Sequence, residues 1–100
     1  MRLFMFYSLR PDCDLDEYKR WSREVDVPAC RAKPCVSRFD VYVSEVGSGA
    51  PLPIVVEDAE VDSYEAWTAA VAAPDHAEIA AQWERFALPD TLVSVPCGER

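Results

Sequence analysis

One histidine carries the strongest signal for acid–base chemistry. His76 is the only histidine in the chain, and imidazole is the side chain whose ordinary pKa lies closest to neutrality. It follows Pro74-Asp75, near the start of an expected helix and on the face that we expect to point inward. A helix N-terminus disfavours a cation, so His76 should stay neutral and be able to accept a proton. The alternative is that it only packs or caps at a helix end.

Two adjacent acids interrupt an otherwise apolar stretch. Glu57 and Asp58 lie in the middle of Ile54 to Val61, where a carboxylate must reach water, be paired or line a cavity. A desolvated glutamate can act near neutral pH, so we predict Glu57 as the catalytic partner of His76. Strand alternation leaves the face of Glu57 open: if Glu57 points at the helices, Asp58 and Glu60 are instead the acids that face the pocket. Solvated surface acids are the competing interpretation.

Four side chains are candidates for binding a substrate. Arg38 and Tyr42 share one row of a strand and could bind a carboxylate or polarise a carbonyl. Arg38 could equally pair with a nearby acid such as Asp40 or Glu57. The other two candidates, Tyr7 and Trp83, would offer stacking walls to a planar heteroaromatic molecule, or would simply fill the core.

Composition narrows the function classes. The 100-residue chain carries a net charge of −8, and its ten Lys and Arg residues are scattered, which argues against nucleic acid as a partner. No segment approaches the roughly 20 apolar residues that span a bilayer, and the apolar start is too short for a signal peptide, so we expect a soluble, cytoplasmic protein. We find no Ser-His-Asp, phosphate-loop or dinucleotide motif.

The four cysteines lack a C-x-x-C pair. Cys30 and Cys35 are separated by four residues, a spacing that could suit a metal, but structural zinc usually needs two tight pairs of ligands. We therefore predict buried, reduced thiols and neither a metal nor a cofactor.

The pattern along the chain predicts the elements that must position these residues. Asp14 with Glu17, and Asp62 with Glu65, form capping boxes that open two amphipathic helices. We expect Pro28 to bend or end the first helix, whose inward face includes Leu15, Tyr18, Ser22 and Val25. The second is expected to be interrupted at Ala73-Pro74 and to stop at Pro89. Gly47 to Pro51 predicts a turn, and the expected strands are Arg2 to Leu9, Val36 to Ser44, Ile54 to Val61 and Thr91 to Cys97.

This order predicts one α+β domain over residues 1–100. A βαββαβ chain with right-handed crossovers places both helices on one face of a four-stranded antiparallel sheet, the ferredoxin-like arrangement. The first strand and the row that contains Phe39 are apolar beyond what the helices should cover. We therefore expect the bare face to be buried against a second copy, giving a homodimer. Two such sheets would enclose an apolar pocket for a small molecule.

The chain resembles the REDY-like/HapK group within the dimeric α/β-barrel superfamily. The resemblance covers nearly the whole length and rests on short segments in a fixed order: Met1-Arg2-Leu3, Glu24-Val25-Asp26-Val27-Pro28, Val36 to Val43, Glu57 to Asp62, and Pro74-Asp75-His76. It implies a role in natural-product biosynthesis, because relatives belong to gene clusters for prodigiosin-type and other pyrrole or indole pigments. They are thought to assist a cyclisation or condensation there without a cofactor.

Three functions follow as hypotheses. The first is a cofactor-independent cyclase or condensing enzyme for a small aromatic molecule, using His76 and Glu57. The second is a cofactor-free monooxygenase of the same superfamily, which oxygen uptake would reveal. The third is a non-catalytic dimeric module for ligand binding or stress response, which a ligand would stabilise without forming a product.

Overall fold

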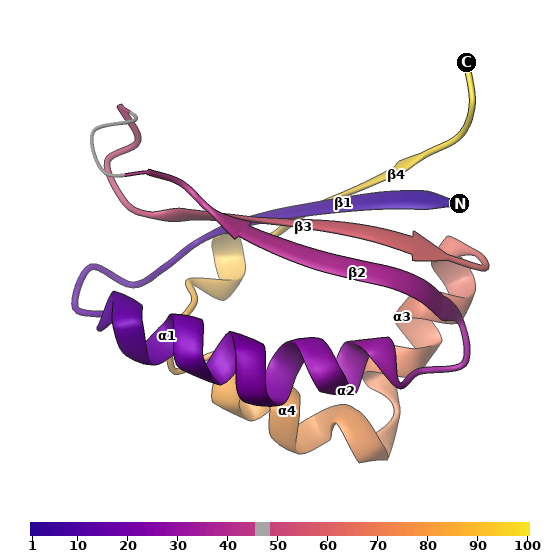
Figure 1. The fold of residues 1–100 in the computed structure, drawn as a ribbon, viewed down its shortest axis with the longest axis horizontal. Helices are drawn as coiled ribbons and strands as arrows, with labels where there is room; N and C mark the ends of the chain where they lie inside the picture. Colours follow the sequence, from indigo (N-terminus) through magenta and orange to yellow (C-terminus); the bar gives the residue numbers. More distant parts are fainter. Residues whose placement is uncertain (46–48) are drawn as a thin grey trace.

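Four antiparallel strands form one sheet in the order β2-β3-β1-β4, and the helices lie against one face of it (Figure 1). The computed structural model describes residues 1–45 and 49–100. The ferredoxin-like fold predicted from the sequence is confirmed. The strands are β1 (Arg2–Ser8), β2 (Val36–Val43), β3 (Ile54–Val61) and β4 (Val93–Cys97).

The strand predictions hold to within two residues. β2 and β3 pair as the expected hairpin, although Gly47 and Ser48 of the predicted turn lie outside the described residues. β4 starts later than expected because a 3-10 turn, Pro89–Thr91, precedes it. In the described ranges, no helix combines the length and apolar character needed to cross a membrane.

The first helical region runs on past the proline that was expected to bend or end it. It comprises α1 (Leu15–Trp21), a π-helical turn (Ser22–Asp26) and α2 (Val27–Arg31). The Asp14 carboxylate accepts a hydrogen bond from the Glu17 backbone N–H, which confirms this N-cap. Pro28 occupies the first turn of α2, so the predicted helix end there is wrong. A proline ring clashes with the carbonyl four residues earlier in a regular helix, and the wider π turn just before Pro28 accommodates it.

The π turn also changes which side chains face inward. Its extra residue shifts the buried row from the expected Val25 to Asp26, because the helix now repeats every fourth residue at this point. Val25, expected on the inward face, is only half-buried, and the Asp26 carboxylate is buried beside it. The buried side chains of this region are Tyr18, Ser22, Asp26 and Cys30.

The second helical region is interrupted where the sequence indicated. It comprises α3 (Tyr64–Ala72), a 3-10 turn (Pro74–His76) and α4 (Ala77–Trp83). Ser63, not Asp62, is the N-cap: its hydroxyl accepts a hydrogen bond from the Ala66 backbone N–H. The backbone N–H of Asp62 donates a hydrogen bond to the carbonyl of Cys35, the residue before β2. α4 ends six residues before Pro89, which was expected to stop it.

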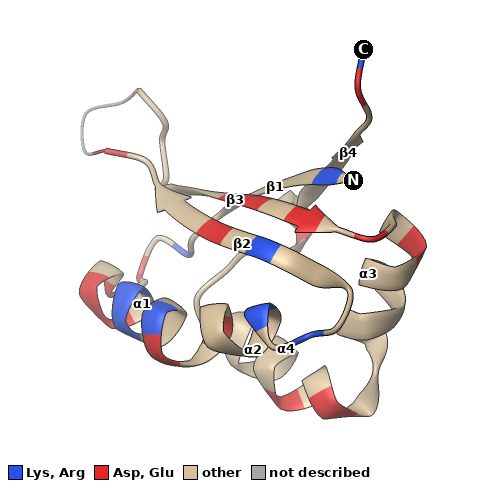
Figure 2. Cartoon of the chain, turned by 45° about the vertical axis from the view of Figure 1, so that its right-hand side comes forward, with Lys and Arg blue, Asp and Glu red and all other residues tan. Residues whose placement is uncertain are grey.

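One row of side chains, the row of β2 that contains Phe39, lies on the opposite face of the sheet from the one predicted. Phe39 is 1% exposed and packs under the helices, so the expectation that its row would be left uncovered is wrong. The uncovered face carries Phe6, Tyr42, Val93 and Val95, all exposed. It also carries charges: in Figure 2 the basic segment of β2 lies beside acidic segments of β2 and β3.

Candidate functional site

A cavity of about 320 Å³ lies between the sheet and the helices of a single chain. Aromatic side chains from both layers form much of its wall, namely Tyr7, Phe39, Tyr64, Trp67 and Trp83. Its volume is at the lower end of the range for small-molecule sites, and a mostly apolar wall with a few polar groups is typical of them. The polar groups relevant to chemistry are Asp26, Cys30, Glu57 and His76.

Glu57 and His76, predicted as partners, line this same cavity. Glu57 comes from the centre of β3, where alternation turns it toward the helices and leaves Asp58 on the opposite face. His76 ends the 3-10 turn that Pro74 opens, which brings the imidazole under α4. The predicted location is wrong: these two side chains face the helices and not a space between two sheets. The cavity that they line therefore lies within one chain.

The imidazole of His76 is buried and incompletely satisfied. Its Nδ1 has no hydrogen-bond partner among the described residues. Burial, followed by the positive charge of Lys33, lowers the pKa of His76. The neutral form predicted from the sequence is thus favoured, although burial and not the helix dipole is its main cause. A neutral imidazole has one nitrogen without a proton, so it is able to act as a base toward a molecule in the cavity.

Glu57 is held by a hydrogen bond from a tyrosine. The Tyr7 hydroxyl donates to Glu57 Oε2 over 3.3 Å, and the Tyr7 and Tyr18 hydroxyls are 2.6 Å apart. Burial and the nearby Asp26 raise the pKa of Glu57, and the bond from Tyr7 opposes that rise only in part. A carboxyl with a raised pKa keeps its proton near neutral pH and can act as an acid. Trp83 packs edge-on against Tyr7, with 5.1 Å between ring centroids, and fixes this tyrosine at the wall.

Asp26 is the site residue that the sequence prediction missed. The π turn places it 5% exposed in the cavity wall, where the Cys30 thiol donates to Asp26 Oδ1 over 3.6 Å. Burial raises its pKa too. The available signal was a repeat of four residues from Tyr18 through Ser22, which leads to Asp26 and not to Val25.

Arg38 and Tyr42 lie outside the cavity, on the uncovered face of the sheet. The Arg38 guanidinium donates to Asp40 over 2.7 Å and to Asp58 over 2.9 Å. Pairing with Asp40 was anticipated, whereas pairing with Glu57 is ruled out by its opposite orientation. Hydrogen bonds from Arg2 and Arg38 lower the pKa of Asp58 to about 2. These groups form a charged network separated from Glu57 by the sheet.

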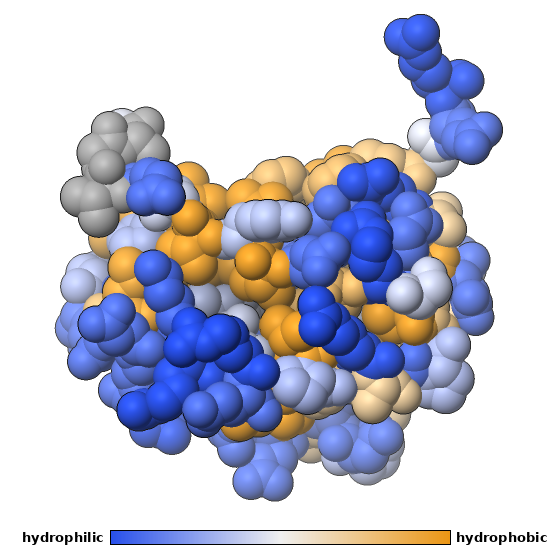
Figure 3. All heavy atoms as spheres, in the orientation of Figure 1, coloured by the Kyte–Doolittle hydropathy of each residue, from blue (hydrophilic) through white to orange (hydrophobic). Residues whose placement is uncertain are grey.

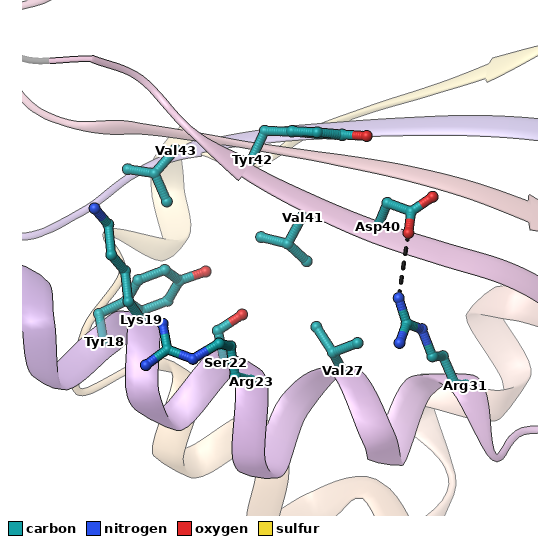
Figure 4. Close-up of a pocket in the computed structure, with 10 residues that line it drawn as sticks. All are labelled: Tyr18, Lys19, Ser22, Arg23, Val27, Arg31, Asp40, Val41, Tyr42 and Val43. Atoms are coloured by element: carbon teal, nitrogen blue, oxygen red, sulfur yellow. Dashed lines mark hydrogen bonds and ion pairs between the residues drawn. The ribbon is translucent and has the colours of Figure 1, made fainter.

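A second hollow, of about 540 Å³, opens between β2 and the first helical region. We call it the edge groove; apolar atoms reach the surface beside it in Figure 3. Figure 4 shows its lining, with Val27 and Val41 facing each other and Arg31 paired to Asp40. Tyr42 lines its rim and Tyr18 its inner end.

The cysteines are all free thiols, as predicted, but only Cys30 is buried; the other three are partly exposed. Burial raises the pKa of Cys30, which keeps it protonated. Over residues 1–45 and 49–100, no group of three Cys, His, Asp or Glu side chains is arranged to hold a metal ion.

Comparison with known proteins identifies relatives of this fold. The family model described as REDY-like protein HapK matches residues 1–96. The crystal structure of HapK from Hahella chejuensis superposes with a TM-score of 0.75 at 21% identity, covering 98% of this chain and 94% of that one. No curated protein matches the sequence.

Two further solved structures show the same fold at lower identity. One is described as a dimeric protein of unknown function and ferredoxin-like fold from Bacteroides fragilis NCTC 9343, with a TM-score of 0.66, 14% identity, and coverage of 94% of this chain and 90% of that chain. The other is an antibiotic biosynthesis monooxygenase, with a TM-score of 0.69, 17% identity, and 98% coverage of both chains.

Proposed function

Because the chain belongs to the HapK family of REDY-like proteins, we propose that it is a cytoplasmic, cofactor-independent enzyme of natural-product biosynthesis. It assists cyclisation or condensation of a small aromatic intermediate by acid–base catalysis. The observation that carries this proposal is the convergence of Glu57 and His76 on one aromatic-walled cavity. Few protein sites bury an acid and a base together without a chemical use for them.

The two groups have complementary protonation states. Burial favours the neutral carboxyl of Glu57 and the neutral imidazole of His76, so both an acid and a base are present at the same pH. In a condensation, His76 takes a proton from the attacking N–H or C–H group. Glu57 gives a proton to the carbonyl oxygen, which becomes a hydroxyl. The proton that His76 took then passes to this hydroxyl, which leaves as water. The second hydrogen of the attacking group is lost to solvent as a proton when the new double bond forms, and the Glu57 carboxylate must regain a proton. Tyr7 holds Glu57 in position for that transfer.

The cavity wall suggests the substrate class. Trp67, Phe39 and Tyr64 offer flat apolar surfaces on which a planar ring can pack. The volume of about 320 Å³ suits a molecule of one or two rings. An indole- or pyrrole-type intermediate, the class implied by the family, meets both conditions.

Turnover of pyrrole and indole carbonyl compounds, followed by mass spectrometry, tests the assigned roles. We expect Glu57→Gln and His76→Ala each to lower the rate by about 10²- to 10⁴-fold, the usual contribution of a positioned acid or base. Tyr42→Phe is the matched control, because Tyr42 lies on the other side of the sheet and should leave the rate unchanged. Unaltered rates in both site variants, with folding intact, would contradict the roles.

The fold shared with an antibiotic biosynthesis monooxygenase supports a second candidate. In that case the cavity would hold an aromatic substrate and oxygen, and turnover would consume oxygen in step with product. A third outcome is a binding module: the aromatic compound then raises the melting temperature but no product forms. An oxygen electrode and a product assay on the same sample separate the three.

We also propose that a second copy covers the open face of the sheet. Phe6, Val93 and Val95 leave apolar surface exposed there, and such patches commonly mark interfaces. The relative from Bacteroides fragilis is described as dimeric.

A further inference from the structure

Two hollows of the molecule meet at a pair of buried tyrosines. Tyr7 and Glu57 line the cavity, whereas Tyr18 and Ser22 line the edge groove. Figure 4 shows the hydroxyls of Tyr18 and Ser22 directed into that groove. Tyr18 is 0% exposed and Ser22 is 5% exposed, so these hydroxyls lie at the inner end of the groove.

The hydroxyls form a continuous hydrogen-bonded series. Tyr7 donates to Glu57 over 3.3 Å, and because it has a single O–H, Tyr18 must then donate to Tyr7 across their 2.6 Å contact. The Tyr18 hydroxyl lies at the wall of the edge groove, so the series ends there. When Glu57 is protonated, its own O–H can donate to Tyr7 and the series can run in the opposite direction. A hydroxyl chain that can reverse its polarity is what proton transfer along it requires.

We propose that Tyr18 and Tyr7 are a proton relay through which Glu57 exchanges its proton with water in the edge groove. In the inward step, a hydronium ion at the inner end of the groove gives a proton to the Tyr18 oxygen and becomes water. The Tyr18 proton passes to Tyr7, and the Tyr7 proton passes to the Glu57 carboxylate. Each tyrosine oxygen gains one O–H bond and loses another, so within the protein only Glu57 changes charge. The outward step is the reverse and releases hydronium to the groove.

The relay gives the acid a route to solvent that a bound molecule does not block. The role of the relay in turnover rests on the proposed function. In that function Glu57 gives its proton to a substrate and must regain one before the next cycle. Core packing alone explains the series less well. Two phenylalanines would fill the same space without burying hydroxyls, which cost free energy unless they are hydrogen-bonded.

Few other ionisable groups surround the series. On the cavity side they are Asp26, Cys30 and His76, and the charged groups at the groove are Lys19, Arg23, Arg31 and Asp40. The tyrosines themselves keep their protons, because burial raises the pKa of both. Transfer therefore proceeds by protons shifting together along the series and not through a free tyrosinate.

A pH-jump experiment with time-resolved infrared detection tests the relay without any substrate. The signal is the C=O stretch of the protonated Glu57 carboxyl, assigned by its loss in Glu57→Gln. We expect Tyr18→Phe to slow protonation of Glu57 by about tenfold, the effect on a barrier of one lost hydrogen bond of ordinary strength. Tyr64→Phe, which removes a hydroxyl from the same cavity wall, should leave the rate unchanged.

Equal rates in wild type, Tyr18→Phe and Tyr64→Phe would overturn the relay and show that Glu57 exchanges through the cavity mouth. If Tyr18→Phe does not fold, the wild-type rate in mixtures of H₂O and D₂O decides: a curved dependence on deuterium fraction indicates several protons in motion, and a linear one overturns the proposal. Neither measurement involves turnover, so the relay and the proposed enzymatic function can fail independently.

Discussion

Glu57 is buried under the helices, and its protonation links the stability of the protein to pH. Burial raises its pKa above the ordinary value of 4.5, so the folded chain holds this proton in a pH range where the unfolded chain has released it. The contribution of Glu57 to the free energy of unfolding is therefore largest below that ordinary value. It falls as the pH rises through the higher folded-state pKa, by at most about 1.4 kcal/mol per pH unit for one group.

Glu57→Gln should flatten this dependence and raise stability at alkaline pH. Denaturant unfolding at a series of pH values from 4 upward, in steps of about one unit, measures the change. A residual fall in the same direction is expected from Asp26, whose pKa burial also raises. Glu24→Gln, at an exposed position of the π turn, is the matched control and should leave the slope unaltered. A slope that is the same in wild type and Glu57→Gln would contradict the shifted pKa.

At the residue scale, side-chain type could be predicted more readily than orientation. An acid in the middle of an apolar strand marked Glu57, and a lone histidine after a proline marked His76. Alternation alone could not say whether Glu57 or Asp58 faced the helices, because both rows of β3 contain apolar residues. Arg38 and Tyr42 were predicted for the site on chemistry alone, and the pleat of β2 places them on the other face.

At the element scale, the two helix starts illustrate how capping can be tested. Ser63→Ala removes the hydroxyl that accepts from the Ala66 backbone N–H and should lower the free energy of unfolding by about 1 kcal/mol. Asp62→Ala leaves this bond intact and should change stability much less. Urea denaturation of both variants compares the two positions. A larger loss in Asp62→Ala than in Ser63→Ala would instead support the capping box predicted from the sequence.

The first helical region shows why element boundaries and faces are hard to predict. Apolar spacing and the Asp14 cap located the helix correctly. Pro28 was expected to bend or end it because a proline lacks an N–H and clashes with the preceding turn. The helix instead continues through Pro28, because the wider π turn Ser22–Asp26 directly before it leaves room for the proline ring. That local solution depends on packing against the sheet, and it is what brings Asp26 into the cavity.

At the scale of the whole molecule, element order sufficed to predict the topology but not the location of the cavity. The βαββαβ order and right-handed crossovers determine the sheet order β2-β3-β1-β4. The cavity exists because the interrupted helix leaves space between α3, α4 and the sheet, around the 3-10 turn Pro74–His76. Such a gap depends on how side chains fill two packed layers, which spacing along one chain does not specify.

The predicted dimer is the property that concerns the whole molecule most directly. The open face combines exposed apolar groups with the network of Arg2, Arg38, Asp40 and Asp58, whose charges already satisfy one another within the chain. Burying these paired charges in a dimer interface has a smaller desolvation cost than burying unpaired charges. The free energy gained by burying the apolar side chains can therefore exceed that cost. We expect the purified protein to sediment as a dimer at micromolar concentration.

Phe6→Asp tests this interface, because Phe6 is 36% exposed and pairs across the sheet with Val56 and Val93. Burying an unpaired carboxylate there should weaken dimerisation by at least about a hundredfold. Ala69→Asp adds the same charge at an exposed position of α3 and should remain dimeric. Analytical ultracentrifugation distinguishes the outcomes. A monomeric wild type would contradict the interface, yet the cavity would persist, since every side chain that lines it belongs to one chain.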